Sequence, residues 1–169
     1  MQRSNKTLTM TGILLALLVL SGLALLSTQS APALADVPAG ATLAETNKLL
    51  VQRAYYEVLS NGNLAVADEI FAPTFQHHLP GFSAIPIGPE GCKLLTMVYH
   101  AAFPDLKYTV EDIVAEGDEV VTRWRASGSH EDFFGPQAPS GERITWTGIT
   151  IHRLADGQIV DEWTSQDTL

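Results

Sequence analysis

The chain has 169 residues, of which 19 are acidic and 10 are basic, and its net charge at pH 7 is −9. An acidic protein of this size repels nucleic-acid phosphates and anionic lipid headgroups, so we expect neither nucleic acid nor a membrane surface as a partner. The only cysteine, Cys92, cannot form an internal disulfide, and its apolar helical surroundings predict a buried thiol.

The first 35 residues have the pattern of a secretory signal. Arg3 and Lys6 give a positive start, residues 13–26 are leucine-rich and apolar, and Ala33-Leu34-Ala35 is a small-x-small cleavage site. We expect cleavage after Ala35 and export to the periplasm or the extracellular space. An uncleaved anchor is the alternative, although the apolar run is shorter than the roughly 20 residues that span a bilayer.

Cleavage there divides the chain into a signal (1–35), a short linker (36–43) and one domain (44–169). The remaining 134 residues can form one hydrophobic core without a disulfide or a structural metal. Because Arg3 and Lys6 are the only charged residues of the signal, its removal changes the net charge from −9 to −11.

The first part of the domain has helical periodicity. Apolar residues recur at three- and four-residue spacing over residues 44–60 and predict the first helix. A shorter helix is expected over 64–71, ended by Pro73, because proline cannot continue a helix. A third helix is expected over 88–103, with a proline in its first turn.

Strand-like runs make up the rest of the domain. The first is expected over residues 74–79. Four longer runs, with turn residues at Glu116-Gly117-Asp118 and Asp156-Gly157, cover residues 107–115, 119–129, 144–154 and 158–164. Helices first and antiparallel strands afterwards predict an α+β domain, with about three N-terminal helices on one face of a curved, mostly antiparallel sheet.

A series of short segments spans nearly the whole domain in a recognisable order and spacing. They are residues 75–78 (FQHH), 88–91 (GPEG), 102–106 (AFPDL), 110–118 (VEDIVAEGD), 123–124 (RW) leading to 128–130 (GSH), 141 with 144–149 (ITWTGI), and 156–163 (DGQIVDEW). In this order they resemble the SnoaL-like polyketide cyclases, also called predicted ester cyclases, of the NTF2-like superfamily. The resemblance implies a cone-shaped barrel around a deep apolar pocket, usually in a homodimer.

The resemblance also implies a chemistry. Cyclases of this group close a ring by an intramolecular aldol step, in which an Asp on the last strand moves a proton alpha to a carbonyl. An apolar pocket raises the pKa of such a carboxyl group toward neutrality. Here that position falls at Thr164, whose hydroxyl cannot act as the base. Glu162, two residues earlier on the same strand face, is the expected base, and a solvated surface residue is the alternative.

Histidines are the expected helpers of this base. His130 follows the 119–129 run, where the family often has a pocket-mouth histidine, and we expect it to orient a substrate carbonyl. His77 and His78 point to opposite faces of their strand, so only one lines the pocket. His152 is expected at the surface. No spacing of the HExxH or paired-cysteine kind occurs, so neither a metal nor another cofactor is expected.

The pocket wall is expected to be largely aromatic, which suits a flat hydrophobic ligand. The residues expected to bind substrate are His77, His78, Trp124, Phe134, Trp146, Thr150, Trp163, Thr164 and Asp167. An arginine between two carboxylates, Arg123 or Arg153, is a further candidate for proton relay, with pairing across strands on the surface as its alternative.

The sequence therefore predicts an exported domain that binds a small hydrophobic carbonyl compound and acts as a cyclase or isomerase. The alternative is a ligand-binding or dimerisation module without catalysis, which the threonine at position 164 favours. A third hypothesis is a protein-interaction adaptor, which would require an exposed apolar patch on the convex face of the sheet.

Overall fold

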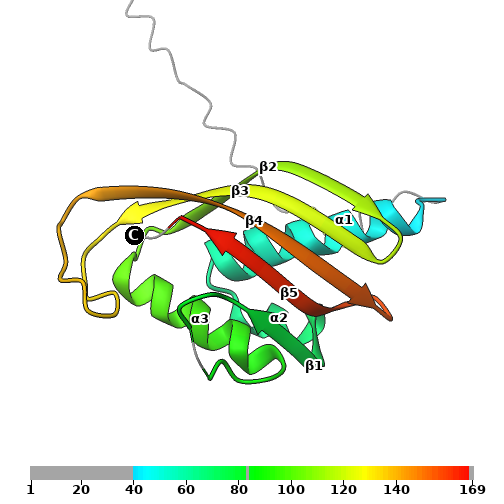
Figure 1. The fold of residues 1–169 in the computed structure, drawn as a ribbon, viewed down its shortest axis with the longest axis horizontal. Helices are drawn as coiled ribbons and strands as arrows, with labels where there is room; N and C mark the ends of the chain where they lie inside the picture. Colours follow the sequence, from blue (N-terminus) through cyan, green and yellow to red (C-terminus); the bar gives the residue numbers. More distant parts are fainter. Residues whose placement is uncertain (1–39, 83, 168–169) are drawn as a thin grey trace, which may run out of the picture.

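The computed structural model describes residues 40–82 and 84–167 (Figure 1). The expected signal lies outside these residues. The helices are α1 (Leu43–Arg53), the π-helical η2 (Ala54–Ser60), α2 (Leu64–Ile70) and α3 (Pro89–Ala102). The strands are β1 (Phe71–His78), β2 (Lys107–Glu116), β3 (Glu119–Ser129), β4 (Arg143–Ala155) and β5 (Gln158–Gln166). In the described part of the chain, none of these helices has the length and apolar character needed to span a bilayer.

The first helix begins with a capping box. The Thr42 hydroxyl accepts a hydrogen bond from the backbone N–H of Glu45, and the Glu45 carboxylate accepts one from the backbone N–H of Thr42. The helix runs without a break from α1 into η2, whose π-helical winding is a form that often occurs at functional sites. Within η2, Tyr55 and Val58 are buried against the sheet.

The sheet has the strand order β1-β5-β4-β3-β2. Strands β2 to β5 pair in chain order as an antiparallel meander, in agreement with the expected antiparallel strands, and β1 pairs parallel to β5 at one edge. The second helix, expected over residues 64–71, ends one residue earlier at Ile70, because Phe71 is already extended. Pro73 is therefore not the residue that stops it. Pro73 lies inside β1, where an edge strand tolerates a residue that cannot donate a ladder hydrogen bond.

The helices cover one face of the curved, unclosed sheet (Figure 1). Alternate residues of β3 and β4 point toward them and form the core with the buried sides of α1, η2 and α3. At the centre of this inner face, the Trp124 indole lies over Gly148. A Cβ at position 148 would overlap that ring, so the glycine makes room for the tryptophan. The expected α+β architecture is confirmed.

The opposite face of the sheet carries a row of side chains, one from each strand. Cross-strand pairing places Val114, Val121, Ile151, Trp163 and His78 side by side, and four of them are apolar. Val114 is 60% exposed, and Ile151 and Trp163 are exposed by 38% and 39%. We call these five residues the outer row.

Candidate active site

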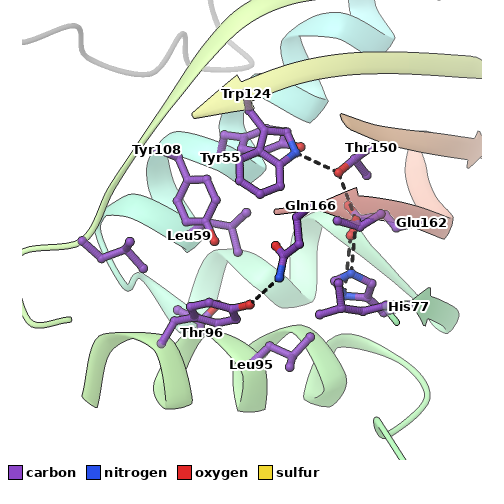
Figure 2. A pocket seen from close by; sticks show the side chains of 14 residues that line it. Tyr55, Leu59, His77, Leu95, Thr96, Tyr108, Trp124, Thr150, Glu162 and Gln166 are labelled. Atoms are coloured by element: carbon purple, nitrogen blue, oxygen red, sulfur yellow. Dashed lines mark hydrogen bonds and ion pairs between the residues drawn. The ribbon is translucent and has the colours of Figure 1, made fainter. Parts of the chain in front are cut away.

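A cavity of about 50 Å³ lies between η2, α3 and the inner face of the sheet (Figure 2). Its polar side chains on the sheet include His77, Thr150, Glu162 and Thr164. The remainder of the wall is mostly apolar or aromatic, and includes Tyr55, Leu59, Leu79, Leu95, Tyr99, Leu106, Tyr108 and Trp124. The cavity is therefore an apolar chamber with one ionisable, polar side.

Glu162 is the carboxylate of this chamber and is only 8% exposed. Its Oε1 accepts a hydrogen bond of 2.8 Å from Nδ1 of His152, and its Oε2 lies 3.8 Å from Nδ1 of His77. Burial acts to raise the pKa of Glu162, but the electrostatic influence and the hydrogen bond of His152 hold that pKa below its usual value. The expected raised pKa is wrong for Glu162, which is a carboxylate at neutral pH.

His152 is 1% exposed and stands behind Glu162. Its Nε2 lies 3.2 Å from the Thr122 hydroxyl, which is itself 2.8 Å from the hydroxyl of Tyr55. The expected surface position of His152 is therefore wrong. Strand alternation explains this, because Thr150, which was expected in the pocket, is two residues away and shares its face.

His77 is the histidine of the pair that lines the cavity. Its Nε2 lies 3.5 Å from the Thr164 hydroxyl, and burial lowers the pKa of His77, so the imidazole is neutral at neutral pH. His78 points outward, where it stacks on Trp163 at 5.1 Å and hydrogen-bonds Asp161 at 3.0 Å.

Hydroxyl groups connect the carboxylate side of the cavity to its aromatic wall. The Trp124 indole N–H donates to Thr150 at 2.9 Å, and the hydroxyls of Thr150 and Thr164 are 3.0 Å apart. All three residues line the cavity. Thr164, the position at which the family's Asp is expected from the sequence, supplies a hydroxyl beside His77.

The structure does not bring His130 to Glu162. The imidazole is buried but does not line the cavity, and it stacks on Phe103 at a ring distance of 5.1 Å. Its Nδ1 lies 3.5 Å from the Ser140 hydroxyl. The orienting role of His130 stays a prediction, and His130 makes no contact with the residues around Glu162. His77, which lines the cavity next to Glu162, has the position that this role requires.

Three aromatic candidates lie outside the cavity. Trp146 is buried behind it, packed on Tyr99 and Phe103 at 6.1 and 5.2 Å. Phe134 packs on Tyr99 at 4.9 Å and lines an adjoining groove of about 520 Å³. Trp163 belongs to the outer row.

The charged candidates lie away from the cavity. Asp167 borders the groove, and its carboxylate accepts hydrogen bonds from the backbone N–H and the hydroxyl of Thr147. Arg123 pairs on the exposed side of the sheet with carboxylates of β2, and Arg153 pairs with Asp161. Surface pairing therefore accounts for both arginines.

The sequence did not single out several residues that the fold brings into the cavity. Tyr108 comes from β2, and Leu95, Thr96 and Tyr99 come from one face of α3. The helical spacing of the α3 residues was a signal from which their common face could have been predicted. For β2 the sequence gives only a weak signal of which residues point inward, because even the inward residues of this strand are at most half-buried. Within residues 40–82 and 84–167, no three His, Cys, Asp or Glu side chains are arranged to hold a metal ion.

The helices on one face of the sheet, with the chamber between them, define an NTF2-like domain. Residues 49–169 match the SnoaL-like polyketide cyclase family, and the chain belongs to this family. No curated protein matches the sequence.

Solved structures of the family share this fold. A candidate SnoaL-like polyketide cyclase from Jannaschia sp. CCS1 is 28% identical, with a TM-score of 0.68 over 75% of this chain and 89% of its own. IdmH, a candidate polyketide cyclase from Streptomyces antibioticus, is 34% identical, with a TM-score of 0.62 over 72% and 91%. TsrD from Streptomyces laurentii is 25% identical, with a TM-score of 0.66 over 72% and 88%.

Two ionisable residues of the site, the partly buried His77 and the buried Glu162, make stability depend on pH in separate ranges. Because burial lowers the pKa of His77, the unfolded chain binds more protons below the ordinary value of 6.5, and the fold loses stability as pH falls from there. The lowered pKa of Glu162 adds a further loss below 4.5. We expect His77→Gln to remove the first loss and retain the second, as measured by urea unfolding between about pH 7.5 and about pH 4.

His78→Gln, a change on the outer face, is the matched control for this experiment. An unchanged dependence on pH between 6.5 and 4.5 in His77→Gln would contradict a buried neutral imidazole at position 77.

Proposed function

We propose that the domain binds a small hydrophobic carbonyl compound and catalyses proton transfer alpha to that carbonyl, as a cyclase or isomerase does. One observation supports this most. A buried carboxylate, Glu162, borders an apolar cavity and is kept ionised by His152. A carboxylate that is desolvated yet deprotonated is suited to act as a general base.

In this mechanism Oε2 of Glu162 takes a proton from the carbon next to the carbonyl, and negative charge develops on the carbonyl oxygen. The Thr164 hydroxyl and the neutral imidazole of His77 lie on the same side of the cavity and can donate hydrogen bonds to that oxygen. Return of the proton to another carbon gives an isomer. Alternatively, attack of the carbanion on a second carbonyl of the same molecule forms a carbon–carbon bond and closes a ring. The alkoxide formed at that carbonyl then takes the proton back from Glu162, which returns to its carboxylate form.

His152 acts in this mechanism as a positioning residue. Its Nδ1–H donates to Oε1 of Glu162, which fixes the carboxylate and leaves Oε2 on the side of His77. The Thr122 hydroxyl, next to Nε2 of His152, holds the imidazole from behind.

Gln166 stands between the cavity and the adjoining groove and lines both. Its side-chain amide donates to the Tyr99 hydroxyl at 3.0 Å, which links β5 to α3. A substrate longer than the cavity would extend past this hydrogen bond toward Phe134 and Phe82, which line the groove.

Replacement of the base tests the mechanism. Cyclohexanone in D₂O exchanges its alpha protons, and NMR follows the rate with and without protein. We expect the wild-type domain to accelerate this exchange and Glu162→Gln to lower the protein-dependent rate at least about 100-fold, because an amide cannot accept the proton.

Glu119→Gln, at an exposed position of β3, is the control and is expected to exchange at the wild-type rate. Equal exchange by Glu162→Gln and the wild-type domain would disprove Glu162 as the base. Binding of cyclohexanone without any acceleration would favour the second candidate, a ligand-binding module, which the hydroxyl at Thr164 supports.

We further propose that the protein is exported and works away from membranes and nucleic acids, on the basis of its leader pattern and its acidity. Expression of the full chain in a bacterium with a secretory pathway should yield a periplasmic or secreted protein that starts at Asp36, as measured by intact mass. Ala35→Asp, which removes the small residue before the cut, should retain the leader. Wild-type protein of full-length mass would contradict cleavage.

We also propose that two copies associate through the outer row. The outer row has an apolar side chain on each of four adjacent strands, β2 to β5, which makes it larger than the scattered apolar residues of an ordinary surface. Ile151→Asp is expected to shift the dimer to monomer and raise the dissociation constant at least about tenfold, as measured by analytical ultracentrifugation. Thr145→Asp, at an exposed position of the same strand, is the control. A wild-type monomer at all concentrations would refute the association.

A further inference from the structure

The cavity has a second set of polar groups, on Thr96 of α3 and Tyr108 of β2. We infer that the hydroxyls of Thr96 and Tyr108 form a second subsite, which binds an additional carbonyl oxygen of the substrate away from Glu162. This inference rests on the proposed function and narrows its substrate class to compounds with two oxygen functions separated by an apolar ring body.

Thr96 supplies the first observation. It is 3% exposed and lines the cavity, and its hydroxyl makes no hydrogen bond to an oxygen or nitrogen of the described residues. Its one polar neighbour among them is the Cys92 thiol, a weak hydrogen-bonding group that leaves the hydroxyl able to bind a ligand oxygen. A helical threonine often bonds the carbonyl four residues earlier, here that of Cys92, and this bond is missing. Two other buried polar atoms also lack partners there, on His130 and Trp146, but neither residue lines the cavity.

Tyr108 supplies the second observation. Its ring packs against Trp124 at 5.3 Å and Tyr55 at 5.9 Å, which fixes the direction of its hydroxyl. Figure 2 shows this hydroxyl pointing into the cavity toward the helix that carries Thr96. Burial raises the pKa of Tyr108, so the hydroxyl keeps its proton and can donate.

The two polar sides of the cavity are separated by the indole of Trp124. One edge of this indole reaches Thr150, which is 3.0 Å from Thr164, and Tyr108 packs against its ring. Figure 2 places Thr96 and Tyr108 on one side of the cavity and Glu162 and His77 on the other. A ligand that satisfies both sides has an apolar body against Trp124 and an oxygen at each end.

Matched ketones test the subsite by binding alone. The probes are cyclohexanone with cyclohexane-1,4-dione, and 4-cyclohexylcyclohexanone with bicyclohexyl-4,4′-dione, so that each pair differs in one carbonyl oxygen and the pairs differ in length. The two equivalent carbonyls of each diketone double its affinity on statistical grounds alone, so the measured ratio of affinities is first divided by two. Calorimetry on the wild-type domain should then show the diketone of at least one pair binding about 2- to 10-fold more tightly than its monoketone. Thr96→Val and Tyr108→Phe should each lower that ratio toward one.

Tyr99→Phe is the matched control, because the Tyr99 hydroxyl also borders the cavity but already accepts from Gln166. It should affect both members of a pair equally. Ratios near one for both pairs in the wild-type domain, or ratios that Thr96→Val and Tyr108→Phe leave unchanged, would overturn the subsite. If alpha-proton exchange still depends on Glu162 in that case, the proposed function stands and only the subsite fails. If no ketone binds, both are overturned.

Discussion

The hydrogen bond between Glu162 and His152 is the interaction on which the site depends. A carboxylate that is nearly excluded from water would be protonated without a partner, and a neutral acid cannot act as a base. The sheet supplies the partner directly, because His152 and Glu162 are paired residues of adjacent antiparallel strands. Side chains of paired residues lie on the same face, so the contact follows from the register of β4 and β5. A shift of β5 by one residue against β4 would turn Glu162 out of the core and away from His152.

The strand register also determines the contacts between the side chains on the inner face of the sheet. Trp124 needs the space over Gly148, and its indole then holds Thr150 in place for Thr164. These contacts join β3, β4 and β5 on one face. The hydroxyls and the carboxylate therefore form one connected polar side, and the helices close the chamber with apolar and aromatic groups. Polar groups that satisfy one another in this way can be buried at little cost.

Much of the fold could be predicted from the sequence because its signals are local. The meander strands have alternating side chains and short glycine turns, and Glu162 was placed correctly on the inner side by its position on the last strand. The parallel pairing of β1 with β5 joins residues more than 80 positions apart and has no local signal. The inward position of His152 was missed, because a histidine between Ile151 and Arg153 is compatible with either face of the strand. Its spacing of two residues from Thr150, which was expected in the pocket, was the signal that indicates the inner face. The π-helical winding of η2 cannot be distinguished from α-helix by periodicity over seven residues.

The edge position of β1 has a consequence for the two histidines beside Glu162. His152 belongs to β4, which has a hydrogen-bonded strand on each side, whereas His77 belongs to β1, which pairs with β5 alone among the described strands. Edge strands open more readily than central strands, so β1 can separate locally while the β4 and β5 pairing persists. Glu162 thus has one partner on a central strand and one on an edge strand. A local separation of β1 would remove the contact with His77 and leave the hydrogen bond from His152 in place.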